Sequence, residues 1–123
     1  MKKLISVMTL LIMAPFTSNL LAQYICEGDC VNGYGLKKFK GSKAYMKGKF
    51  SEGVLQEGTV TFQNGDVFTG IFKDNFLQEG TKLFHSGKKL EGKFHQNVLT
   101  DGVMTETNGV STRIKLKPLG MVN

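Results

Sequence analysis

The chain has 123 residues, which is the length of a single ordinary domain. It carries 16 basic and 10 acidic residues, a formal net charge of +6, with two cysteines and two histidines. His85 and His95 are expected in different strands, so the chain offers too few converging ligands for zinc. No Ser–His–Asp, Cys–His or paired-carboxylate arrangement is visible. We therefore expect a protein that is not an enzyme, with no cofactor, no metal and no nucleic-acid partner.

Residues 1–22 have the pattern of a helical secretory signal peptide. Two lysines precede an apolar run from Leu4 to Phe16, and Ala22 is a small residue before the expected cut. The run of 13 residues is shorter than the ~20 that a membrane-spanning helix needs, although an uncleaved anchor is the alternative. Removing residues 1–22 takes two basic residues and no acidic one, which leaves a net charge of +4. The sequence predicts an exported protein, periplasmic or secreted.

Residues 23–42 are expected to form an irregular capping repeat that contains both cysteines. An even cysteine count in an exported chain favours a disulfide between Cys26 and Cys30, with Gly28 giving the small loop its backbone freedom. A lipid anchor on Cys26 is the rival, but Tyr24-Ile25 stands where small residues would precede a lipidated cysteine.

A cluster of lysines falls within 13 residues that contain no Asp or Glu. Such a cluster can attract phosphates or anionic surfaces, but lysines on an exposed edge strand also prevent sheet-to-sheet aggregation. The lysines are Lys37, Lys38, Lys40, Lys43, Lys47 and Lys49.

Residues 43–117 contain a 22-residue repeat, which indicates one supersecondary unit copied and stacked. No repeated column carries a nucleophile or an acid–base pair. The column of large apolar residues is Phe50, Phe72 and Phe94. The columns of structural glycines are Gly48, Gly70 and Gly92; Gly58, Gly80 and Gly102; and Gly65, Gly87 and Gly109.

Each repeat has the alternating pattern of a bent β-hairpin. Gly53, Asn75 and Asn97 are expected in a left-handed turn, after which Val54-Leu55 and its equivalents cover part of the aromatic face. A three-residue loop such as Gln63-Asn64-Gly65 puts all even-numbered apolar residues on one face. That face comprises Met46, Phe50, Val60, Phe62, Phe68, Phe72, Phe84, Leu90, Phe94, Met104, Ile114 and Leu116, with Lys82 and Glu106 as polar departures.

Glycine weakens a strand unless something packs over it, so we expect the phenylalanine rings to lie on the column glycines. Residues 110–117 keep the apolar phase and are read as a half-repeat that caps the sheet, with 118–123 as a tail. The expected fold is all-β: a single elongated, twisted antiparallel sheet of repeated hairpins, with about seven strands between residues 43 and 117.

Three stretches resemble the MORN repeat, whose pattern is an aromatic residue, then Gly, then Phe or Trp: Tyr45–Phe50, Val67–Phe72 and Lys89–Phe94. Residues 26–35 resemble the degenerate first repeat of exported bacterial members. The chain departs from the family in keeping the leading aromatic only as Tyr45. The resemblance implies an elongated sheet of hairpins that contacts proteins or membrane lipids, with no catalysis of its own.

Two functions follow as hypotheses. The first is a module for protein–protein interaction in the cell envelope, which uses the aromatic face around Phe50, Phe72 and Phe94 to bind an unidentified protein. The alternative is peripheral binding to an anionic membrane surface or another polyanion through the Lys37–Lys49 cluster. Curling of the sheet could also bury the aromatic face entirely, which would leave no contact patch.

Overall fold

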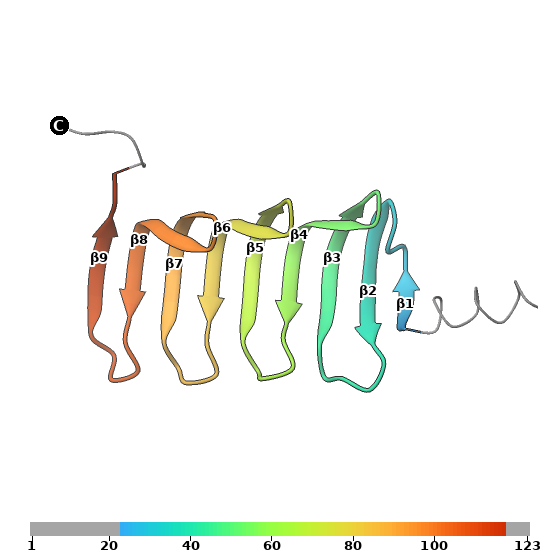
Figure 1. Ribbon diagram of the computed structural model, residues 1–123, viewed down its shortest axis with the longest axis horizontal. Coiled ribbons are helices and arrows are strands. Elements are labelled where there is room, and N and C mark those ends of the chain that lie inside the picture. Colours follow the sequence, from blue (N-terminus) through green and yellow to red (C-terminus); the bar gives the residue numbers. More distant parts are fainter. Residues whose placement is uncertain (1–22, 118–123) are drawn as a thin grey trace, which may run out of the picture.

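The computed structural model describes residues 23–117, which form one antiparallel sheet of nine strands with no helix among them. The predicted signal peptide and the tail lie outside the described residues. Every strand pairs with its neighbours in sequence, so the order is β1 to β9 without a crossover, and the sheet is long across its strands (Figure 1). The strands are β1 (Tyr24–Gly28), β2 (Gly33–Phe39), β3 (Tyr45–Ser51), β4 (Val54–Thr61), β5 (Val67–Lys73), β6 (Phe76–Leu83), β7 (Lys89–His95), β8 (Val98–Thr105) and β9 (Ser111–Lys115).

The expected all-β sheet of hairpins is confirmed, and β3 to β9 are the seven strands expected between residues 43 and 117. The hairpin between β4 and β5 has the predicted three-residue loop. Val60 pairs with Phe68, the Phe62 amide donates to the Asp66 carbonyl at 2.9 Å, and Gly65 closes the loop with a φ of 97°. This register places the even-numbered apolar residues on one face, as the alternation required.

The hairpins at the opposite end of the strands close with two-residue turns. Asp74 and Asn75 have φ angles of 50° and 68°, which is the left-handed backbone of a type I′ turn. Asn75 was expected in this conformation from its sequence column. The left-handed backbone of the preceding residue, Asp74, was not expected, because the equivalent residues in the other repeats are neither glycine nor asparagine.

A β-bulge follows each two-residue turn and changes which side chains reach the core. Phe72 pairs with Leu77 and Ile71 pairs with Glu79, so Gln78 is an extra residue without a partner. The bulge turns odd-numbered Leu77 to the same face as even-numbered Phe72. The structure therefore shows how the residues after the turn cover the aromatic face: one leucine per repeat is buried, namely Leu55, Leu77 and Leu99.

The glycine columns allow the backbones of adjacent strands to approach closely. Gly70 pairs with both Gly58 and Gly80 and has a φ of 147°, which favours glycine. A Cβ at Gly70 would overlap the Glu79 carbonyl oxygen and lie 2.8 Å from the Gly80 Cα. The atoms nearest to such a Cβ are therefore backbone atoms of the next strand.

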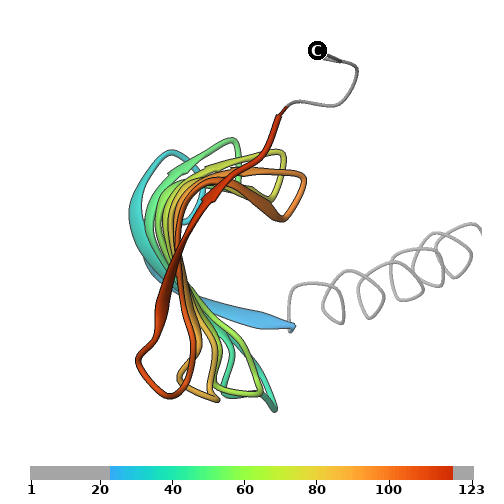
Figure 2. The ribbon, with the colours of Figure 1, turned by 90° about the vertical axis from the view of Figure 1, so that its left-hand side faces the viewer.

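Glycine kinks of this kind let strands curve, and the sheet is C-shaped in cross-section (Figure 2). The apolar residues line the concave face. The buried hydrophobic residues of the described chain are Cys30, Phe50, Leu55, Phe72, Leu77, Phe94 and Leu99, with Met46, Val60, Phe68, Leu90 and Ile114 packed against them.

The predicted disulfide between Cys26 and Cys30 is present, and it links β1 to the turn before β2. Asp29, inside this small loop, accepts hydrogen bonds from the amides of Val31 and Asn32. These amides lower the pKa of the Asp29 carboxyl. The disulfide and the Asp29 turn together fix the N-terminal end of the described sheet.

Candidate binding groove on the concave face

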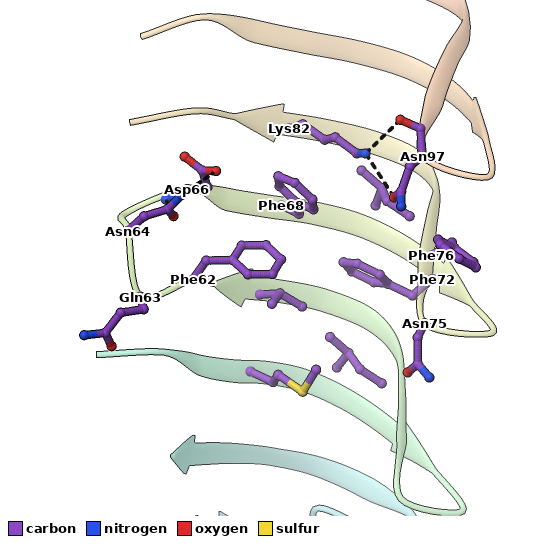
Figure 3. A pocket seen from close by; sticks show the side chains of 14 residues that line it. Phe62, Gln63, Asn64, Asp66, Phe68, Phe72, Asn75, Phe76, Lys82 and Asn97 are labelled. Carbon is purple, nitrogen blue, oxygen red and sulfur yellow. Dashed lines mark hydrogen bonds between the residues drawn. The ribbon is translucent and has the colours of Figure 1, made fainter. Parts of the chain in front are cut away.

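The concave face contains a groove of about 790 Å³ between β3 and the turn that joins β7 to β8. Its apolar wall comes from strands β3 to β6, and polar residues stand at its two ends (Figure 3). Because the described chain is a single sheet, no second layer covers this wall. The lining residues are Met46, Leu55, Val60, Phe62, Gln63, Asn64, Asp66, Phe68, Phe72, Asn75, Phe76, Leu77, Lys82 and Asn97.

Phenylalanine rings form the main apolar surface of the groove. The Phe62 and Phe68 rings meet edge to face, with centroids 4.7 Å apart, and Phe84 continues the row 6.1 Å from Phe68. Phe62 is 39 % exposed and Phe76, at the opposite end, is 41 % exposed. Partly exposed aromatic rings provide apolar contact area and lose little side-chain entropy on binding.

Lys82 is the one charged residue among the buried side chains of the described chain, with 4 % of its surface exposed. It projects from β6 onto the apolar face, where the equivalent residues one repeat earlier and later are Val60 and Met104. Its ammonium donates to the backbone and side-chain oxygens of Asn97, at 3.1 and 3.2 Å (Figure 3). The same ammonium lies 4.8 Å from the Phe68 ring centroid and 5.0 Å from that of Phe94.

The charge of Lys82 has no carboxylate within ion-pair distance among residues 23–117. The Asn97 oxygens and the ring faces are neutral, so they orient the ammonium without cancelling its charge. Burial lowers the pKa of Lys82, which is the expected effect of moving an ammonium out of water. The groove therefore contains a buried cation beside an apolar wall.

Asp66 lies at the end of the groove formed by the β4–β5 loop, and its carboxylate already has hydrogen-bond partners within the protein. Its Oδ1 accepts from the His85 amide at 2.9 Å and its Oδ2 accepts from the Asn64 side chain at 3.1 Å. The His85 amide is the main reason why the pKa of Asp66 is lowered. Asp66 thus ties the β4–β5 loop to the end of β6 and positions the wall of the groove.

The predicted binding residues Phe50, Phe72 and Phe94 are all buried, at 2 %, 7 % and 7 % exposure. Only Phe72 lines the groove. The more exposed rings are Phe62, which the alternation placed on this face, and Phe76, which the alternation did not identify as a contact residue.

The lysine cluster is divided by the strands. Lys37 pairs with Met46, which puts it on the concave face, and its ammonium lies over the rings of Tyr24 and Phe50. The other five are exposed: Lys38, Lys47 and Lys49 share the convex face, and Lys40 and Lys43 lie in the β2–β3 connection. Lys38 also forms an ion pair with Glu27 at 3.1 Å.

The described part of the chain contains no group of three or more His, Cys, Asp or Glu residues that could hold a metal ion. None of its elements is a helix of the length and apolarity needed to span a membrane. No protein-family model matches the sequence, and no curated protein matches it. The resemblance to MORN repeats therefore stays a prediction that depends on the three quoted stretches.

Proposed function

We propose that the protein is a non-catalytic interaction module of the cell envelope whose concave groove binds a protein partner. The observation that carries this proposal is the uncovered aromatic wall, with Phe62 and Phe76 each about two-fifths exposed on either side of a groove of about 790 Å³. Apolar surface gathered in one concave place is the usual form of a contact site. The resemblance to MORN repeats and the signal-peptide pattern support the same proposal.

The test compares a groove variant with a convex-face variant of the same chemistry. Phe62→Ser combined with Phe76→Ser removes both exposed rings of the groove. Ile71→Ser is the control, because Ile71 is 49 % exposed and points to the opposite face from Phe72. Each protein is cross-linked in an envelope fraction, and the captured proteins are compared by mass spectrometry.

We expect one protein, or a small set, to be captured by the wild type and by Ile71→Ser, and to be lost with the double groove variant. Similar thermal melts of the three proteins would show that the loss reflects the surface. Capture that survives the double groove variant, or that disappears with Ile71→Ser alone, would refute the groove as the contact site.

A polyanion surface is the alternative, supported by Lys38, Lys47 and Lys49 on the convex face of β2 and β3. Exposed charges of this kind are screened by salt, whereas apolar contacts persist. Liposomes containing an anionic phospholipid should therefore release the protein as salt rises if the lysines are responsible. Binding that persists at high salt would favour the groove instead.

A further inference from the structure

We propose that the concave groove is a binding site for a medium-chain carboxylate, whose apolar chain lies on the apolar wall and whose carboxylate pairs with Lys82. This ligand class goes beyond the proposed protein contact and does not depend on it. Lys82 is the one buried charge in the described chain, and an anionic group is the chemistry that would complement it.

A buried ammonium is costly unless its charge and its hydrogen-bonding capacity are both met. Lys82 has three donors, and two of them reach the backbone and side-chain oxygens of Asn97. Its position is occupied by Val60 and Met104 in the adjacent repeats, so the fold accepts an apolar residue there. The lysine is thus dispensable for the repeat, and an anionic ligand would supply the missing counter-charge.

The wall beside Lys82 fits an unbranched apolar chain. Phe68 pairs directly with Lys82 across β5 and β6, and Val60 and Met46 continue the same row on β4 and β3. Three strand spacings separate β6 from β3, a distance of about 14 Å. A medium-length alkyl chain in extended form covers that row while its carboxylate stays at Lys82.

The other charged group of the groove sets the direction of the ligand. Asp66 lies at the β4–β5 loop, where its two side-chain oxygens accept hydrogen bonds from His85 and Asn64. It is unavailable as a partner for Lys82 and would repel an anion at that end. The carboxylate is therefore directed to the remaining donor of the Lys82 ammonium, and the methyl end points across β4 toward β3.

Dodecanoate is the probe, and dodecanol is the matched neutral ligand with the same chain. Both are titrated into the purified protein by calorimetry, below the concentration at which dodecanoate forms micelles. We expect saturable binding of dodecanoate that is ~10- to 100-fold tighter than binding of dodecanol, because a charge-assisted contact to a buried group is lost with the alcohol. Dodecanoate should also raise the melting temperature.

Lys82→Met is the decisive variant, since methionine is the residue at the equivalent position 104. It should fold, and it should bind dodecanoate and dodecanol with equal affinity. Lys93→Met is the control: it removes one positive charge from an exposed residue on the convex face and should leave the preference for dodecanoate intact.

The proposal is overturned if the wild type binds the two ligands equally, if it shows no saturable binding of dodecanoate, or if Lys82→Met keeps the preference. The comparison within the wild type needs no variant, so it stands even if Lys82→Met fails to fold. No partner protein is present in this assay, and its failure is therefore distinct from failure of the proposed protein contact.

Discussion

Substitution of Gly70 by valine tests whether close backbone approach sets the shape of the sheet. Valine is the better strand former, so propensity alone predicts a gain in stability. The structure predicts a loss, because a Cβ at this position would overlap the Glu79 carbonyl oxygen and crowd the Gly80 Cα at 2.8 Å. Neither group is the movable end of a side chain, so the strands must separate.

Two costs add at Gly70. A residue with a side chain at a φ of 147° is strained by roughly 1–3 kcal/mol. Overpacking against fixed neighbours costs a further ~1–3 kcal/mol. A total of about 2–6 kcal/mol is a large part of the ~5–15 kcal/mol that stabilises a typical domain. At ~4–8 °C per kcal/mol for a chain of this size, even the lower limit should reduce the melting temperature by about 8 °C.

Two controls separate the two costs in thermal melts. Thr69→Val changes an exposed residue whose hydroxyl lies 3.2 Å from that of Thr59, and it should shift stability by at most about 0.5 kcal/mol. Gly53 has a φ of 80° and nothing lies within 4 Å of an added Cβ, so Gly53→Ala reports backbone strain without crowding. A melting temperature for Gly70→Val equal to that of Thr69→Val would refute the reasoning, and a loss no larger than that of Gly53→Ala would remove the crowding component.

Three further outcomes are expected. The hydrogen bond from the His85 amide lowers the folded-state pKa of Asp66 below 3.8, so the contribution of Asp66 to stability is present above that pH and is lost as pH falls through the lowered pKa. In a plot of melting temperature against pH, Asp66→Asn should therefore reduce the fall at acidic pH. An unchanged fall would point to other carboxyls such as Asp29. Reduction of the Cys26–Cys30 disulfide should cost roughly 2 kcal/mol for so small a loop, measured by denaturant titration with and without reductant, and two free thiols in non-reduced protein would remove this prediction. Leu77→Ala, at a side chain that is 2 % exposed, should cost ~2–5 kcal/mol in the same titration, and a change below 1 kcal/mol would show that the leucine column is not part of the core.

The register of the sheet was predictable because the alternation of apolar residues leaves one solution. With Phe62 and Phe68 both required on the buried face, only a three-residue loop at Gln63-Asn64-Gly65 satisfies both, and the structure has that loop. The left-handed turn at Asn75 was predictable for a similar reason, since asparagine tolerates that backbone.

The β-bulges were not predictable from the pattern. The extra residue is Gln56, Gln78 or Thr100 in successive repeats, and these residue types do not distinguish a bulge from a regular strand position. Without the bulge, the leucine two residues after each turn counts as solvent-facing. The core leucines were therefore expected only as a loose cover over the rings.

The burial of Lys82 in the groove could not be predicted from the sequence. The alternation identified it as a charged residue on the apolar face, but its burial depends on the turn of the next hairpin, where Asn97 supplies two oxygens to the ammonium. The lysine cluster shows the opposite case: Lys37 and Lys38 are adjacent in sequence, yet alternation places them on opposite faces. Sequence proximity alone could not group them.

The strictly sequential pairing of β1 to β9 also governs how the chain reaches its fold. Each strand meets only the strands before and after it, so all pairings are local in sequence and contact order is low. A hairpin can form anywhere along the chain and be extended from either side, one strand at a time. Gain or loss of one 22-residue unit would then lengthen or shorten the concave surface by two strands while every other pairing is preserved.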